Sequence, residues 1–231
     1  LEPPRHTRLR SLVLRAFTSR RIKELSPEIT QLAHAKIDAF PTNQPFDVLS
    51  TFCQPIPVIV IARLLGVPDH MARQLLTWSN NMVAMYQASR TYETECRAAE
   101  AATAFSDFLR AYIDTRRTEP RDDLITHLIA AEESGEKLST DELITTCILL
   151  LNAGHEATVH TMGNGIKLLL EQNHAVVPGT PDLPCEEILR YDPPLHMFTR
   201  YAYEDVTVFG HRFRRGDQVA LLLASANRDK T

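Results

Sequence analysis

The sequence predicts a mainly α-helical protein with a small antiparallel β part towards the end of the chain. Over 69–90 and 92–117, apolar residues recur at steps of three and four positions, which is typical of helices that bury one face. From Phe198 onward, apolar residues tend to fall at every second position between turns that contain glycine, which is typical of short strands. With 231 residues the chain is long enough for one large domain, and we expect 1–231 to form a single one.

The composition is that of an ordinary globular protein, with 44% hydrophobic residues, 23% charged residues and a net charge of −4. These values exclude a disordered chain, a collagen and a protein that binds nucleic acid through bulk positive charge. The longest uncharged apolar stretch, 143–154, is shorter than the roughly 20 residues of a membrane-spanning helix, so we expect no membrane span.

The four cysteines, Cys53, Cys96, Cys147 and Cys185, lie far apart in the sequence. None belongs to a CxxC pair or a Cys/His cluster, so we expect no metal site built from this chain's own ligands. The residues at 1–4 are charged or turn-forming and do not resemble a signal peptide. We therefore expect a cytoplasmic protein with reduced cysteines.

The sequence predicts where one short helix ends and where the next, long helix begins. A short helix is predicted over 124–133, because the Ser-Gly pair at 134–135 can form a helix C-terminus. Ser139 and Glu142 then have the spacing of a capping box, in which each side chain accepts a hydrogen bond from the other residue's backbone N–H. They predict the start of a long helix that runs to about Glu171 and measures roughly 45 Å.

The middle of this long helix carries its most unusual residues. The run 148–151 is apolar on every face, which predicts a helix inside the core. The next segment, 152–158, breaks the pattern, because Gly154 is a poor helix former and Glu156 places a charge in an apolar element. We interpret this as a helix opened beside a flat or bulky bound group, with an acid placed to move protons. The alternative is a glycine packed against another helix and a glutamate that reaches a surface groove.

After a turn at 178–181, a short helix is predicted over 185–191, ended by Asp192 and two prolines. Glu187 and Arg190 lie one turn apart on this helix and can form an ion pair. Such pairs are more often solvated surface pairs than functional ones.

Basic residues gather at the beginning of the chain. His6 and Arg10 are four residues apart, so on a helix they share one face and could clamp an anionic group. The alternative is a solvated basic helix. The same alternatives, steering of an acidic partner or a solvated face, apply to the wider basic cluster of Arg5, Arg8, Arg10, Arg15, Arg20, Arg21 and Lys23.

Four motifs in this order resemble those of a bacterial cytochrome P450. They are EPPRHTRLR at 2–10, AGHEAT at 153–158, EILRYDPP at 187–194 and ANRD at 226–229. The resemblance covers essentially the whole chain with fitting spacing. It implies part of the cytochrome P450 helical fold, with haem b as the cofactor.

The resemblance implies a role for each motif. His6 and Arg10 would bind one haem propionate and Arg200 the other, whereas the Glu187–Arg190 pair would be structural. The segment 153–158 would cross the distal haem face. Its Ala153 and Gly154 would open the groove for oxygen, and Glu156 would deliver protons through water. The substrate side of the haem would be lined by Leu195, His196 and Phe198.

The sequence departs from the family in places that bear on the chemistry. The family holds its iron with a cysteine thiolate in a Phe-x-x-Gly-x-x-x-Cys-x-Gly loop, and no cysteine here has these neighbours. We therefore expect a fragment that lacks this loop and the first helices of the family. The usual acid–threonine pair is replaced by Glu156-Ala157, so Thr158 or ordered water would relay protons. The stretch 171–186 is also shorter than usual.

The sequence thus predicts a haem-thiolate monooxygenase that hydroxylates a small apolar organic substrate. It would use O2 and two electrons from a ferredoxin or flavin reductase, and terpene, fatty-acid, steroid and polyketide substrates all fit. Trp78, Met82, Met85 and Tyr86 lie where the family's pocket roof is expected, although such spacing is more typical of plain core. The alternative is a haem-free remnant without catalysis that acts as a binding or scaffold protein.

Overall fold

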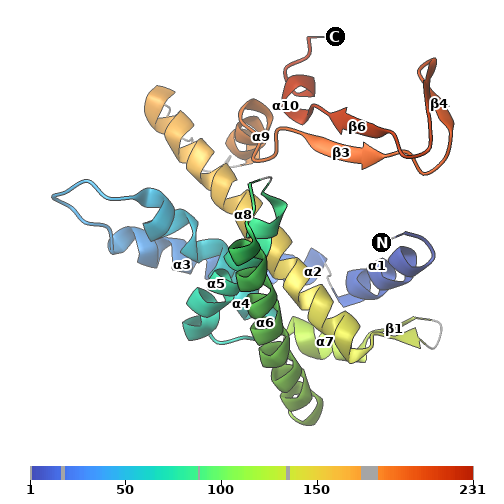
Figure 1. Ribbon diagram of the computed structural model, residues 1–231. Helices are drawn as coiled ribbons and strands as arrows, with labels where there is room; N and C mark the ends of the chain where they lie inside the picture. Colours follow the sequence, from blue (N-terminus) through green and yellow to red (C-terminus); the bar gives the residue numbers. More distant parts are fainter. Residues whose placement is uncertain (1, 17–18, 88, 134–135, 173–181, 231) are drawn as a thin grey trace. The chain divides into compact units, whose positions relative to one another are not determined.

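The computed structural model describes residues 2–16, 19–87, 89–133, 136–172 and 182–230 (Figure 1). The turns expected at 134–135 and 178–181 lie outside these residues. Helices account for most of the described chain, which confirms the predicted mainly α-helical fold. The backbone groups into two compact units, Leu1–Glu156 and Ala157–Thr231. The boundary falls inside the helix α8 (Thr140–Gln172), which therefore contributes to both units.

The first unit is built mainly from helices. Its single turns are the π-helical η1 (Leu49–Cys53) and the 3-10 turns η2 (Asp69–Met71) and η3 (Ala84–Tyr86). Its α-helices, besides the first part of α8, are α1 (Arg5–Ala16), α2 (Ser19–Glu24), α3 (Ser26–Asp38), α4 (Pro55–Leu65), α5 (Ala72–Val83), α6 (Tyr92–Thr118) and α7 (Leu124–Ala130).

The helix predicted over 92–117 is confirmed as α6, whereas the one predicted over 69–90 is divided into η2, α5 and η3. The helix predicted over 124–133 is wrong in its last residues, because α7 ends at Ala130. The strand β1 (Glu132–Glu133) instead pairs antiparallel with β2 (Glu136–Lys137). The register places Glu132 opposite Lys137 and Glu133 opposite Glu136, so the backbone is extended where the sequence predicted the end of a helix.

The predicted capping box at the start of α8 is confirmed. The backbone N–H of Glu142 donates to Ser139 Oγ at 3.2 Å, and the N–H of Ser139 donates to Glu142 Oε2 at 3.0 Å. Arg8 of α1 also donates through Nη2 to Glu142 Oε1. One carboxylate therefore completes the helix start and ties α1 to it.

We expect Ser139→Ala to lower the free energy of unfolding by about 1 kcal/mol, because the N–H of Glu142 loses its acceptor. Urea unfolding would measure the change. Thr145→Ala is the control, since Thr145 Oγ donates only to carbonyl groups of its own helix, at 2.8 and 3.1 Å. A loss for Thr145→Ala as large as for Ser139→Ala would contradict the capping role.

One face of α8 belongs to the core of the first unit. Leu143, Cys147 and Leu151 have exposed fractions of 1% or less. Leu149, however, is 64% exposed, so the prediction that 148–151 is buried on every face is wrong. An apolar run does not reveal which of its sides meets the rest of the fold, because burial depends on which neighbours pack against the helix.

α8 is also continuous, drawn as one unbroken helix in Figure 1, so the predicted interruption at 152–158 is wrong. The reason lies in packing at Gly154. A Cβ there would lie 2.8 Å from Cδ1 of Ile61 in α4, so the missing side chain lets the two helices approach closely. This contact offsets the roughly 1 kcal/mol that a glycine costs within a helix.

A buried polar network joins the ends of α4, α6 and α7. Arg116 donates through Nε to Asp123 Oδ2 at 2.6 Å, and both side chains are less than 5% exposed. Arg116 Nη2 also donates to the Tyr112 hydroxyl at 2.6 Å and to the Gly66 carbonyl at 3.2 Å. Asp123 Oδ1 accepts from the N–H of Thr126 at 2.8 Å and so caps α7. These hydrogen bonds make the network a structural joint between three helices.

In the second unit, the last part of α8 packs against α9 (Asp182–Tyr191), where a Cβ on Gly165 would lie 2.8 Å from Ile188 Cδ1. α9 starts three residues before the predicted helix and ends where predicted. The predicted antiparallel β part is confirmed as two separate two-stranded ladders. They are β3 (Phe198–Tyr201) with β6 (Gln218–Leu221) and β4 (Val206–Val208) with β5 (His211–Phe213), followed by the short helix α10 (Leu223–Ala226).

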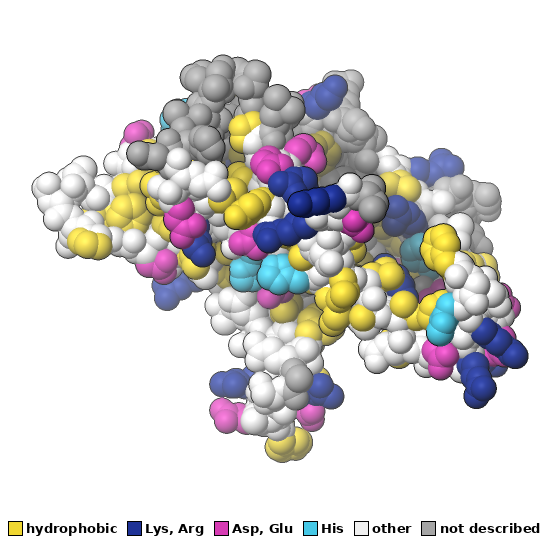
Figure 2. Space-filling model, turned by 90° about the horizontal axis from the view of Figure 1, so that it is seen from above, with side chains coloured by type: hydrophobic (Ala, Val, Ile, Leu, Met, Phe, Trp, Pro, Cys, Tyr) yellow, Lys and Arg dark blue, Asp and Glu magenta, His cyan; other side chains and the backbone are white. Residues whose placement is uncertain are grey.

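Within the described ranges, no helix combines the length and the apolar character needed to cross a membrane. Large hydrophobic side chains are nevertheless exposed in both units, and Figure 2 shows several of them among charged side chains. Tyr86 in the first unit is 86% exposed. Phe209 in the second unit lies fully exposed at the turn between β4 and β5, with a positive φ of 50°.

Candidate functional site

One side of α8 is exposed over about two helical turns. Leu149, Ala153, Glu156 and Ala157 are all exposed, and their spacing of four, three and one residues places them on one side of the helix. We call these four positions the open face of α8. The side chains at 153 and 157 are only methyl groups, so a flat group could approach the helix backbone there.

Glu156 is the only ionisable residue of the open face. Its apolar neighbours in the sequence suggested a charge inside the core. The side chain is instead exposed, so the charge is solvated. Thr158 is exposed as well, but two helical positions correspond to a rotation of about 200°. The structure therefore places Glu156 and Ala157 near one another on the helix surface and turns Thr158 to the other side.

The residues between Ala153 and Glu156 face the first unit. Gly154 packs against Ile61, as the alternative interpretation of this glycine expected, and its role toward a cofactor stays a prediction. His155 is only 3% exposed, and its Nδ1 lies 3.4 Å from Oγ of the buried Ser79 in α5. The sequence interpretation did not single out His155. Its position four residues after the buried Leu151 was the available signal for a core-facing side chain.

α1 presents His6 and Arg10 together. Both are exposed and lie four residues apart on one face of the helix, as predicted. Arg8, halfway between them, points the other way and binds Glu142, and the fully buried Leu12 belongs to the core. The contacts of Arg8 and Leu12 therefore fix the orientation of α1, while His6 and Arg10 are turned to solvent, where an anion could bind.

The Glu-x-x-Arg pair of α9 forms in the second unit. Arg190 donates to both Glu187 oxygens, at 2.6 and 2.7 Å, and these hydrogen bonds hold the pKa of the Glu187 carboxyl below its usual value. Arg190 Nη1 also donates to the carbonyl of Asn227 at 3.1 Å. The pair is exposed, and its geometry links α9 to the segment that follows α10.

The remaining predicted residues lie close together along the chain before and within β3. Leu195, His196, Phe198 and Arg200 are all exposed. Arg200 donates to the carbonyl of Thr199 at 3.0 Å, and its guanidinium lies 4.2 Å from the centre of the Phe198 ring. His196 Nε2 is 3.4 Å from an Asp192 oxygen. His196 also borders an open hollow of about 360 Å³, lined by Tyr191, Asp192, Pro193, His196, Ala224, Ser225 and Arg228.

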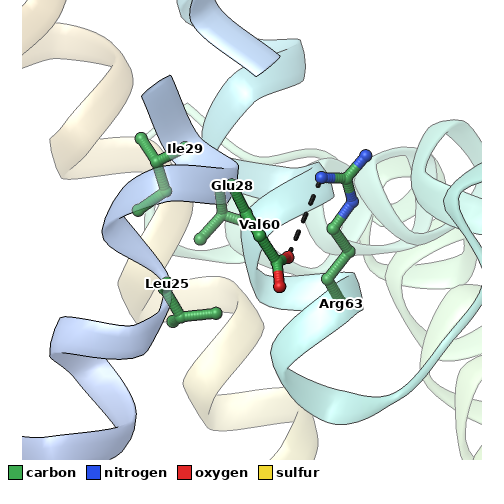
Figure 3. A pocket seen from close by; sticks show the side chains of 5 residues that line it. All are labelled: Leu25, Glu28, Ile29, Val60 and Arg63. Atoms are coloured by element: carbon green, nitrogen blue, oxygen red, sulfur yellow. Dashed lines mark ion pairs between the residues drawn. The ribbon is translucent and has the colours of Figure 1, made fainter. Parts of the chain in front are cut away.

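A second pocket, in the first unit, is not connected with any predicted site residue. Glu28 and Arg63 face each other beside it, 4.0 Å apart, and the apolar side chains of Leu25, Ile29 and Val60 line the rest (Figure 3). The space between these side chains has no room for a water molecule. Arg63 is held more closely by Asp69, at 2.7 Å, so its charge is already balanced.

Cys53 and Cys147 are buried thiols, and neither has the sequence neighbours of the family's ligand cysteine. Burial raises the pKa of the Cys147 thiol to about 12 and also raises that of Cys53, with a smaller contribution from nearby Asp47. Among the described residues, no group of three or more His, Cys, Asp or Glu side chains is arranged to hold a metal ion.

Comparison with known proteins identifies the family of these motifs. Residues 1–176 match the family model for cytochrome P450. The chain is 38% identical to the polyketide biosynthesis cytochrome P450 PksS of Bacillus subtilis (strain 168), covering 99% of this chain and 56% of PksS. It is 39% identical to the vitamin D(3) 25-hydroxylase of Pseudonocardia autotrophica, covering 99% of this chain and 57% of that protein.

A solved structure agrees with these relatives. The ligand-free cytochrome P450 TbtJ1 is 36% identical, with a TM-score of 0.89, and the match covers 99% of this chain and 62% of TbtJ1. The chain thus spans somewhat more than half the length of the relatives it matches.

Proposed function

Because this chain belongs to the cytochrome P450 family, we propose that the whole protein is a haem-thiolate monooxygenase that hydroxylates a small apolar organic molecule with O2 and two electrons. The open face of α8 is the observation that carries this proposal. It offers an exposed apolar strip with small side chains at 153 and 157, and it places the carboxylate of Glu156 beside that strip. This is the arrangement that oxygen chemistry above a flat cofactor requires.

The residues present fit a haem. Its macrocycle needs an apolar surface, which the exposed Leu149, Ala153 and Ala157 supply, and its propionates need cations. We assign His6 and Arg10 to one propionate and Arg200 to the other, since each is exposed and can donate to a carboxylate. When bound, haem with a cysteine thiolate supplies the activation of O2. None of the four cysteines here has the sequence neighbours of the family's ligand.

Within this site, Glu156 carries protons. Its exposed carboxylate can exchange protons with solvent and pass them through water along the open face. Thr158 points away from Glu156, so we assign the relay to water and not to Thr158.

The substrate and the electron donor follow from the same assignment. We place the apolar substrate beside Leu195, His196 and Phe198. The names of two relatives point to a polyketide (PksS) and to vitamin D (the 25-hydroxylase), and both agree with an extended apolar skeleton. A ferredoxin or flavin reductase would deliver the electrons, steered by the basic residues of α1 and by Lys23. We also propose that the enzyme is cytoplasmic.

The absorption spectrum of the full-length gene product tests the function. Reduced and exposed to CO, it is expected to show the band near 450 nm that the family's thiolate-bound haem gives. A protein that folds but binds no haem would overturn the proposal and support a remnant that acts as a binding or scaffold protein.

A further inference from the structure

His155 is a buried histidine that the proposed mechanism does not use. It stands between Gly154 and Glu156, yet only 3% of its surface is exposed. Its Nδ1 lies 3.4 Å from Ser79 Oγ and 3.2 Å from the carbonyl oxygen of Leu151. A proton on Nδ1 can be shared between these two oxygens. The ring therefore makes a polar contact between α8 and α5 inside the first unit.

A polar pair is an uncommon choice for this place in the core. The neighbouring core positions of α8, Leu151 and Val159, are apolar, and an apolar residue at 155 would need no hydrogen-bond partner. Buried polar pairs contribute little net stability, but a hydrogen bond is directional, whereas apolar contacts tolerate sliding and rotation. The pair between His155 and Ser79 therefore restricts how α8 can turn against α5.

The partner helix is itself firmly placed. Trp78, next to Ser79, stacks on Phe105 of α6 with ring centres 5.3 Å apart, which favours the core interpretation of Trp78 over the pocket interpretation. Leu75, one turn earlier in α5, is fully buried. Ser79 has no exposed surface either. A hydrogen bond to Ser79 therefore connects His155 to a helix that is itself held in place by packing in the first unit.

The rotation of α8 determines where Glu156 points. Successive residues of a helix are about 100° apart, so Glu156 reaches the open face only while His155 faces α5 and Gly154 faces Ile61. Turning the helix by one position would bring the carboxylate to the place of His155, in the core, which is strongly unfavourable. The contacts of Gly154 and His155, from two sides, hold Glu156 in its exposed orientation.

We propose that His155 is a positioning residue for Glu156, and that its hydrogen bond to Ser79 sets the orientation of the helical turn that delivers protons. This proposal rests on the monooxygenase function proposed above. Poor proton delivery wastes electrons, because O2 that takes up two electrons and two protons without transferring oxygen to the substrate leaves as hydrogen peroxide. The pair therefore affects how much of the electron supply ends in product.

Ser79→Ala in the full-length, haem-containing protein tests the proposal. It removes only the hydroxyl group and leaves His155 bonded to Leu151, so the fold should persist. We expect the product formed per electron pair to fall at least about threefold, with a matching rise in hydrogen peroxide. Haem content and the reduced CO spectrum should stay unchanged. Hydrogen exchange of the α8 peptide 152–158, a readout independent of turnover, should become faster.

Three further variants separate positioning from a general loss of packing. Thr77→Ala is the matched control on α5, because Thr77 Oγ is exposed and donates only within its own helix, to Arg73 at 2.9 Å; it should leave both readouts unchanged. His155→Leu should repeat the effect of Ser79→Ala. His155→Asn, which keeps a hydrogen-bonding group near the position of Nδ1, should restore most of the product yield.

The outcomes distinguish this proposal from the proposed function. If the wild-type protein hydroxylates its substrate and Ser79→Ala changes neither the product yield nor the exchange of 152–158, the positioning role is wrong. Faster exchange with an unchanged product yield also overturns it and leaves only a structural contact. If the wild-type protein binds no haem and forms no product, the monooxygenase function itself fails, and this proposal fails with it.

Discussion

Replacing Arg116 with methionine is expected to destabilise the protein by about 3–5 kcal/mol. The substitution leaves the carboxylate of Asp123 only 4% exposed and without the guanidinium that now lies 2.6 Å from it. It also removes the donor to the Tyr112 hydroxyl and one of the two donors to the carbonyl at Gly66, where α4 ends; the other donor is the Tyr112 hydroxyl. Such a loss is a large part of the roughly 5–15 kcal/mol by which a domain is stable, so poor folding is the expected result.

Urea unfolding of the full-length protein measures this loss, and two variants test its cause. Arg110→Met breaks an ion pair of similar length, 2.7 Å to Asp141, but in an exposed position, so its effect should be much smaller. Adding Asp123→Asn to Arg116→Met removes the unpaired charge while keeping an oxygen that can cap α7. Stability should then partly return. Equal losses for Arg116→Met and Arg110→Met would show that burial of the pair does not matter.

The elements that the sequence predicted well are those fixed by local chemistry. The start of α8 follows from Ser139 and Glu142, whose side chains bind backbone groups three residues away, and no distant contact is needed to specify it. Its end near Gln172 follows from the length of the apolar pattern. The antiparallel strands after Phe198 likewise follow from alternating residues and nearby turns.

The failures concern properties that depend on neighbours far away in the sequence. Gly154 predicts a broken helix if only helix propensity is considered, but contact with Ile61, more than ninety positions earlier, keeps α8 continuous. Leu149 belongs to an apolar run and is nevertheless exposed, because the core covers only one side of the helix.

The candidate site divides in the same way. Ala153 and Glu156 could be selected from the sequence, because small residues and an acid are conspicuous in an apolar helix. The direction in which their side chains point could not be predicted from the sequence, and neither could the role of His155. Both depend on Ser79 and Ile61, which belong to other helices and carry no signal of their own in the sequence.

The second large effect is expected from Glu156→Gln. The amide has nearly the same shape as the carboxylate and keeps the open face of α8 polar at this position, but it cannot take up and release protons at neutral pH. A positioned acid or base typically contributes about 100-fold or more to a reaction rate, so product formation should fall by about 100-fold. Because Glu156 is exposed and is not assigned to the haem propionates, haem content and stability should not change.

Steady-state turnover with haem content measured on the same samples checks this expectation, and the rate in heavy water gives a second reading. If Glu156 supplies protons, the variant should become slow in a step that is sensitive to deuterium, because protons then arrive by a poorer route. Glu171→Gln is the control on the same helix, where the carboxylate is exposed and lies 3.9 Å from Lys167, remote from the open face. Unchanged turnover in Glu156→Gln would assign proton delivery to another group. An equal loss in both variants would trace the effect to the charge of α8 and not to the position of Glu156.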